Sequence, residues 1–148
     1  MISPGTPVLL DTSIVIHLAR GGVAAERLES RFGFRSRALT PSISAVTVGE
    51  LLAFAERNDW GQRKRESLQQ LIGNLIVVDV RRPGVLRTYA ALDTHLKRSG
   101  TPMGQQNDVW IAATAAATGA VLVTADKDFD VLHPGHIQRE WVDPQSLR

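Results

Sequence analysis

Short runs of Val, Ile and Leu alternate along this chain with longer stretches of helical periodicity, and this alternation constrains the fold more than any other feature. Unbroken apolar runs are typical of strands buried on both faces, as in a parallel sheet. Strands are predicted at 7–11, 39–44, 75–79 and 120–124, with an edge strand at 137–142. Helices are predicted directly after the first strand and at 24–32, 47–58, 62–74, 85–99 and 107–118. Together they indicate an α/β domain on a mostly parallel sheet.

Several residues have the chemistry of helix boundaries. Thr12 or Ser13 is predicted to cap the helix that follows the first strand. The spacing Thr47-x-x-Glu50 is that of a capping box, which predicts a helix that begins at Thr47. Gly119 follows an Ala-rich helical stretch and is expected to end it.

Length and composition limit the classes of protein to which the chain can belong. Its 148 residues, 43% hydrophobic and 22% charged, suit a single globular domain spanning 1–148, with no linker or repeat. The absence of cysteine excludes a disulfide framework, a zinc–thiolate site and a cysteine nucleophile. No apolar run is long enough to span a membrane and the first residues do not resemble a secretory signal, so we expect a soluble, cytoplasmic protein with no membrane partner.

The cationic residues suggest an anionic partner without proving one. Arginine outnumbers lysine 14 to 3, and the formal net charge is +2. Two clusters stand out: Arg20, Arg27, Arg31, Arg35 and Arg37, then Arg57, Arg63, Lys64 and Arg65. Arginine is well suited to bind phosphate, so these clusters either contact a polyanion or form ordinary solvated faces.

Five acidic residues follow the ends of predicted strands or begin predicted helices: Asp11, Glu50, Asp108, Asp126 and Asp128. Ligands of parallel sheets bind beyond the carboxyl ends of the strands, so we expect these side chains to converge. Taken singly, each has a structural explanation as a turn former, a capping-box acid or a partner of a helix dipole. Clustered carboxylates repel unless a cation lies among them, and an all-oxygen ligand set suits Mg²⁺, with Mn²⁺ as a substitute.

Four segments carry a family resemblance: 8–13 (Val-Leu-Leu-Asp-Thr-Ser), 44–51 (Ser-Ala-Val-Thr-Val-Gly-Glu-Leu), 107–115 (Asn-Asp-Val-Trp-Ile-Ala-Ala-Thr-Ala) and 122–129 (Leu-Val-Thr-Ala-Asp-Lys-Asp-Phe). In this order they resemble the four motifs of PIN-domain ribonucleases, in particular the VapC toxins of bacterial toxin–antitoxin pairs. Each motif is weak alone, whereas the four together are specific. The resemblance extends from Val8 to Val142.

The resemblance implies a single three-layer α/β/α PIN domain, Mg²⁺-dependent endoribonuclease activity, a homodimer and a cognate antitoxin that neutralises the protein. Carried over residue by residue, Asp11 and Asp108 match the principal metal ligands of the family. Glu50 and Asp126 match its supporting acids. The implied mechanism is hydrolysis of an RNA phosphodiester bond by metal-activated water.

Hydroxyl groups are also implied at the site. Ser13 or Thr12, together with Thr124, matches the family's hydroxyl positions. The sequence departs from the family in the last motif, where the final acid is often spaced differently after the threonine. The role therefore falls to Asp126 or Asp128, and we favour Asp126.

Histidine and tryptophan are given structural interpretations. Water can be the nucleophile, so the mechanism does not need the histidines, which are expected to be structural or surface residues: His17, His95, His133 and His136. The tryptophans are expected in the core or at a dimer interface rather than as platforms for stacked bases: Trp60, Trp110 and Trp141.

Other functions remain as alternatives. A non-toxin PIN nuclease has the same motifs, and a non-catalytic RNA- or protein-binding module keeps the same fold, although none of the acids is missing here. An aspartyl-phosphate enzyme would require a second Asp two residues after Asp11, where the chain has Ser13. A receiver-like signalling domain would place its phosphate acceptor after the third strand, near Asp79.

Overall fold

Five short strands form one sheet in the computed structural model, which describes residues 2–148. The strands are β1 (Val8–Leu10), β2 (Ser42–Ser44), β3 (Ile76–Val78), β4 (Val121–Thr124) and β5 (Gln138–Trp141). They lie in the order β3-β2-β1-β4-β5, and every neighbouring pair is parallel. The predicted parallel sheet is confirmed, and the segment predicted as an edge strand is the edge strand β5.

The predicted helices are all present, with ends within two residues of the expected ones. They are α1 (Thr12–Arg20), α2 (Gly22–Phe32), α3 (Ala45–Arg57), α4 (Gln62–Gly73), α5 (Val85–Ser99) and α6 (Gln106–Thr118). Three short 3₁₀ helices complete the fold: η1 (Phe34–Ser36), η2 (Lys127–Leu132) and η3 (Pro144–Leu147). Within residues 2–148, no helix has the length and apolar character needed to cross a bilayer.

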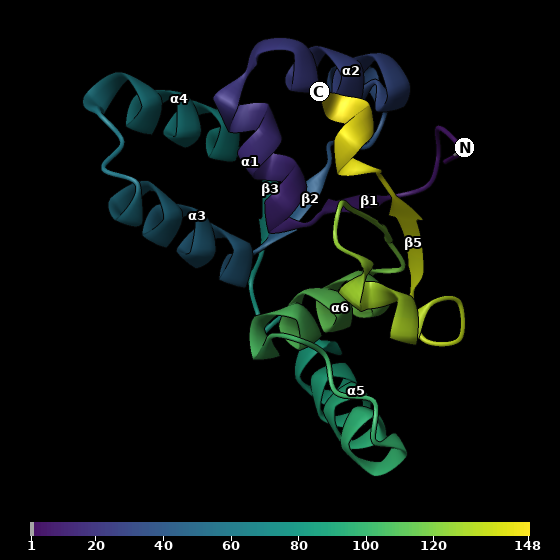
Figure 1. Cartoon of the computed structure of the whole chain (residues 1–148). Coiled ribbons are helices and arrows are strands. Elements are labelled where there is room, and N and C mark those ends of the chain that lie inside the picture. The colour runs from purple at the N-terminus through teal and green to yellow at the C-terminus, as the bar shows by residue number, and fades with distance from the viewer. Residues whose placement is uncertain (1) are drawn as a thin grey trace.

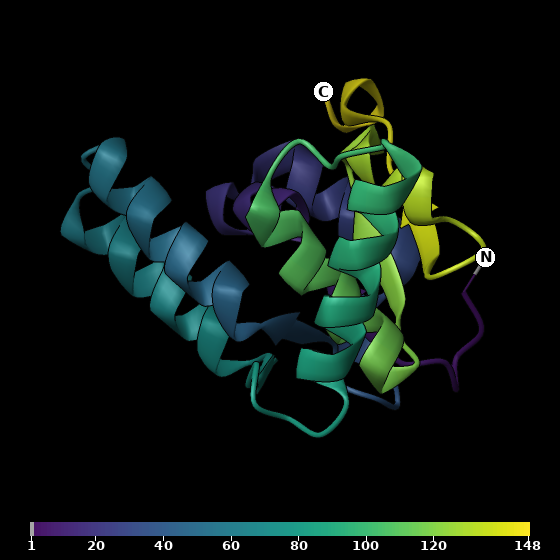
Figure 2. The same cartoon turned by 90° about the horizontal axis from the view of Figure 1, so that it is seen from below.

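Helices cover both faces of the sheet, which makes three layers (Figure 1). Leu10 and Val123 face a core shared with helices α1 to α4, whereas Leu9 and Leu122 face a second core shared with α5, α6 and η2. Successive strand residues point to opposite faces, so β1 and β4 each contribute to both cores. Figure 2 shows α3 and α4 side by side as an arm, with α5 and α6 packed together across a gap between the ribbons.

The caps of two helices differ from the predicted ones. Asp11 caps α1, because its side chain accepts a hydrogen bond from the Thr12 backbone N–H. The predicted capping box is wrong: α3 begins at Ala45 with Ser44 as its N-cap, so Thr47 lies inside the helix. Strand β2 runs directly into α3 without a loop, which places the start of the helix earlier than the capping-box spacing indicates.

The order of the strands fixes where a binding site can form. The chain begins in the middle of the sheet at β1, moves outward to β2 and β3, and then crosses to β4 on the other side of β1. The carboxyl ends of β1 and β4 therefore flank the point where the winding reverses, and crevices open at such points. Asp11 follows β1 directly, and Asp126 follows β4 by two residues.

Candidate metal centre

Asp11 is held rigidly at the end of β1. Its Oδ1 accepts from the Thr12 backbone N–H at 2.8 Å, and its Oδ2 accepts from the hydroxyls of Ser13 at 2.9 Å and Thr124 at 2.7 Å. The residue is only 4% exposed. Burial raises the pKa of Asp11, the three hydrogen bonds oppose that rise, and the charge of Asp126 adds to it. The hydroxyl positions predicted at Ser13 and Thr124 therefore lie at the site.

Asp108 lies in the first turn of α6 and points into the same region. The residue is 7% exposed, and its Oδ2 is buried with no hydrogen-bond partner among the described residues. Burial, followed by the charges of Asp11, Asp126, Glu50 and Asp128, raises the pKa of Asp108 to about 7. An unpaired buried carboxylate oxygen raises the free energy of the folded protein. A bound cation offsets both the cost of burying the charge and the repulsion between the carboxylates.

Asp126 and Asp128 both reach Asp108. One carboxylate oxygen from each of the three residues lies within 4.8 Å of the others. Asp126 is placed by two hydrogen bonds: its N–H donates to the Thr124 hydroxyl at 2.9 Å, and its Oδ1 accepts from the Asp128 N–H at 2.8 Å. The second bond makes Asp126 the N-cap of η2 and turns Asp128 toward the centre. The structure thus brings both candidates for the final acid to the same place.

Glu50 approaches from α3. Its Oε1 accepts from the Thr12 hydroxyl at 2.7 Å, and its Oε2 lies 3.5 Å from the Asn107 amide nitrogen. The hydroxyl of the buried Thr47 lies 3.1 Å from that of Thr12. The sequence interpretation missed Thr47 and Asn107 as site residues. Both had a signal: Thr47 is three residues before Glu50 on one helix, and Asn107 directly precedes Asp108.

Gly104 is a third residue that the sequence interpretation missed. A Cβ atom at this position would lie 2.5 Å from Asp128 Oδ2, so any larger residue displaces that carboxylate. The loop between α5 and α6 thus passes close to the acidic centre, by which we mean the carboxylates of Asp11, Glu50, Asp108, Asp126 and Asp128. No local pattern indicates this contact, because it depends on how the loop packs against η2.

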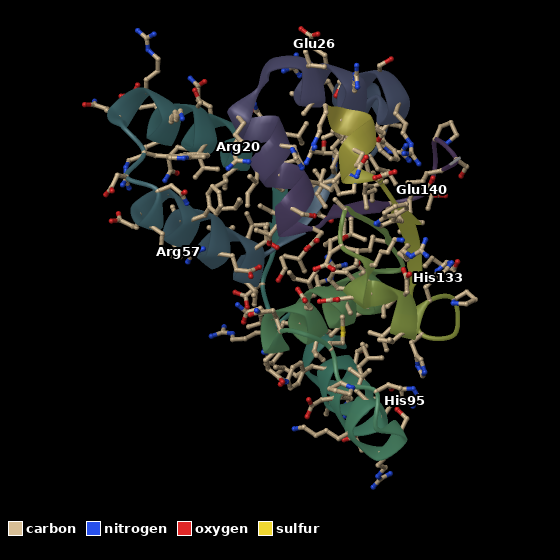
Figure 3. The ribbon with its side chains drawn as sticks, in the orientation of Figure 1. Arg20, Glu26, Arg57, His95, His133 and Glu140 are labelled. Atoms are coloured by element: carbon tan, nitrogen blue, oxygen red, sulfur yellow. The ribbon has the colours of Figure 1, made fainter. Side chains whose placement is uncertain are left out.

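The histidines lie outside the group of three carboxylates. His95 packs against His136, with ring centres 4.2 Å apart, and His133 accepts a hydrogen bond through Nδ1 from the Arg139 N–H. Figure 3 shows His95 on α5 and His133 beyond η2. The donor set of the centre is therefore made of carboxylate oxygens, which suits hard cations such as Mg²⁺ and Mn²⁺.

The tryptophans have three different surroundings. Trp60 is buried edge-on against Phe54, as expected for a core residue. Trp110 stacks on Tyr89 between α6 and α5, with ring centres 3.6 Å apart. Trp141 lies on β5 beneath the ammonium group of a lysine from η2. The latter two are only partly buried.

A parallel sheet in the order β3-β2-β1-β4-β5, with carboxylates gathered beyond β1 and β4, defines the class of this protein. The PIN domain family model matches residues 8–133, and the chain belongs to this family. The recognition of the family from the four sequence motifs is thereby confirmed.

The chain is similar to a VapC ribonuclease and to solved VapBC structures. It is 28% identical over 116 residues to "Ribonuclease VapC2" from Haemophilus influenzae, an alignment that covers 78% of this chain and 83% of the relative. The VapBC2 structure from Rickettsia felis, bound to a DNA fragment from its promoter, matches with a TM-score of 0.77 at 22% identity, covering 92% of this chain and 98% of the other. VapBC-1 from nontypeable Haemophilus influenzae matches with a TM-score of 0.67 at 27% identity, covering 90% and 96%.

Proposed function

We propose that this protein is a Mg²⁺-dependent endoribonuclease and the toxin of a toxin–antitoxin pair. One observation carries the proposal: Asp108, whose buried Oδ2 has no hydrogen-bond partner among the described residues, lies in a cluster with the carboxylates of Asp126 and Asp128. The similarity to Ribonuclease VapC2 supports RNA as the substrate. The similarity to VapBC complexes supports an antitoxin partner. The homodimer is implied by the family resemblance alone.

The acidic residues divide into those that bind the cation and those that place the others. Asp108, Asp126 and Asp128 would hold Mg²⁺, with Asp11 completing the set from the end of β1. A bound divalent cation supplies neutralisation of the scissile phosphate and a water with a lowered pKa. Thr124 fixes both Asp11 and Asp126 through one hydroxyl, so a single residue aligns the acids that follow two different strands.

Glu50 has a separate role in this proposal. Its carboxylate acts on Asp108 through charge, and the Thr12 hydroxyl and the Asn107 amide hold it from two sides. A carboxylate placed in this way accepts a hydrogen bond from the attacking water and orients it toward the phosphate. No histidine is needed for this step.

Cleavage of RNA by purified protein tests the proposal. We expect Mg²⁺ to support cleavage of single-stranded RNA and EDTA to abolish it. Asp11→Asn and Asp108→Asn should each remove activity, and expression of the wild type, but of neither variant, should arrest bacterial growth. Asp143→Asn is the matched control, because Asp143 caps η3 and is not part of the acidic centre. Undiminished cleavage in excess EDTA, or by both site variants, would contradict the proposal.

A further inference from the structure

Lys127 stands between two residues of the acidic centre in the sequence, yet its ammonium group pairs with neither. None of the ion pairs formed by residues 2–148 includes it. Its Nζ instead lies 4.7 Å from the centre of the Trp141 ring. This cation–π contact holds an exposed positive charge on the residue that lies between Asp126 and Asp128 in the sequence.

The position of Trp141 places that charge at the carboxyl edge of the sheet. Trp141 on β5 is the direct partner of Thr124 on β4. Paired residues of neighbouring parallel strands project from the same face, and the strands are about 4.8 Å apart. The Thr124 hydroxyl donates to Asp11, so the indole lies on the same face as the acidic centre, one strand further toward the edge. Trp141 Nε1 is buried, and Lys127 Nζ lies over the ring.

Four of the nine cations in the two sequence clusters are engaged within the protein. Side chains in those clusters donate to a carboxylate or to backbone carbonyls: Arg27, Arg31, Arg37 and Arg65. Arg20 and Arg57 lie on the side of α1 and α3, across the molecule from β5, where Figure 3 labels Glu140. Lys127 is, by contrast, next to the acidic centre in the sequence.

We propose that Lys127, held against Trp141, binds the RNA backbone phosphate next to the one that lies at the acidic centre. This subsite rests on the proposed ribonuclease function, since an RNA chain presents a second phosphate one nucleotide away from the first. An ammonium among the carboxylates would take the place of the metal cation. The aromatic ring keeps it outside the cluster and restricts its motion, so less entropy is lost when a phosphate binds.

Salt dependence of RNA binding tests this subsite. The ligand is a mixed-sequence single-stranded oligoribonucleotide, and binding is measured in the Asp108→Asn background so that the RNA stays intact. Lys127→Gln should reduce the slope of log affinity against log salt by about 0.7, the value for one contact with single-stranded nucleic acid. Lys127→Arg should restore the slope. Lys97→Gln is the control, because Asp93 already neutralises that lysine, and it should leave the slope unchanged.

Cleavage kinetics in the otherwise wild-type protein separate this subsite from the proposed function. Lys127→Gln should raise KM and leave kcat nearly unchanged, because the contact is present in both the ground state and the transition state. If the wild type cleaves no RNA, the proposed function itself fails. If it cleaves RNA but Lys127→Gln changes neither KM nor the salt slope, only the Lys127 subsite is overturned. A slope change for Lys64→Gln, the other lysine over a tryptophan, with none for Lys127→Gln would also overturn it.

Discussion

At the scale of single residues, Asp108 determines the electrostatics of the site. It combines deep burial with a carboxylate oxygen that has no hydrogen-bond partner, whereas buried polar atoms are normally paired. The hydroxyl of Thr124 and the N–H of Thr12 stabilise the charge of Asp11, but Asp108 has no comparable donor. Burial and then the charges of the neighbouring acids raise the pKa of Asp108 to about 7. The residue is thus placed to exchange a proton for a cation.

The raised pKa predicts how the stability of the metal-free protein depends on pH. Above about pH 4 the unfolded chain has lost the Asp108 proton, but the folded protein keeps it until about pH 7. The free energy of unfolding should therefore fall as pH rises from about 4 to about 7 and then level off. In Asp108→Asn the free energy of unfolding should fall less over this pH range, by roughly 2–4 kcal/mol, because the titration of Asp108 is removed. Urea unfolding in EDTA across this range measures it.

The difference between the two pH profiles is the diagnostic quantity, because titrating groups remote from Asp108 contribute equally to both, and what remains belongs to Asp108 and the acids coupled to it. Parallel profiles for the wild type and Asp108→Asn would mean that Asp108 ionises as freely in the folded chain as in the unfolded one.

The sequence allowed Asp108 to be selected as a site residue from its place at the start of a helix. It did not allow the pKa to be predicted, because burial and four neighbouring acids depend on the tertiary structure.

At the scale of elements, the convergence of the acids follows from the direction of the strands. Unbroken apolar runs correctly predicted parallel strands, and parallel strands end at one edge of the sheet. Asp11 and Asp126 could therefore be assigned to one region from sequence. The start of α3 was misjudged, because Ser44 ends β2 and caps the helix at once. Glu50 thereby faces Thr12 instead of closing a capping box.

The contact between Gly104 and Asp128 joins the α5–α6 loop to η2 and predicts an effect of a single methyl group. Gly104 does not have a positive φ, so Gly104→Ala is compatible with the backbone and should leave the metal-free protein as stable or slightly more stable. The new Cβ would displace the exposed Asp128 carboxylate from the cluster. We expect Mg²⁺ affinity to fall roughly tenfold or more, as measured by calorimetric titration.

A glycine next to another site acid provides the control for this substitution. Gly49 precedes Glu50 in α3, and a Cβ there meets no atom within 4 Å. Gly49→Ala should stabilise the helix slightly and leave Mg²⁺ affinity unchanged. Equal Mg²⁺ affinity for the wild type and Gly104→Ala would show that Asp128 does not contribute to the cation site.

At the scale of the whole molecule, two cores on opposite faces of one sheet hold the site at their common edge. The core around α1 to α4 positions Asp11 and Glu50, and the core around α5, α6 and η2 positions Asp108 and Asp128. The layers were predictable from the periodicity of the helices. The distance between the two sets of acids at the carboxyl edge of the sheet could not be predicted, because it depends on packing between segments far apart in sequence.

Binding of an antitoxin is expected to inhibit RNA cleavage by the intact complex. The family resemblance implies an antitoxin whose C-terminal segment covers the acidic crevice and places a basic side chain among the carboxylates. Such a side chain takes the place of the metal cation, so the purified complex should not cleave RNA. Proteolytic removal of the partner should restore Mg²⁺-dependent cleavage. A stoichiometric complex with full ribonuclease activity would contradict this mode of inhibition.

The most direct test of the account is whether one Mg²⁺ site unites the acids of separate segments. Thermal melting of the wild type, Asp108→Asn and Asp143→Asn is compared in EDTA and in Mg²⁺ at matched ionic strength. The account predicts that Mg²⁺ at a hundredfold excess over its dissociation constant stabilises the wild type and Asp143→Asn by about 2.7 kcal/mol, and Asp108→Asn much less. A full Mg²⁺ shift in Asp108→Asn, or no shift in the wild type, would contradict it.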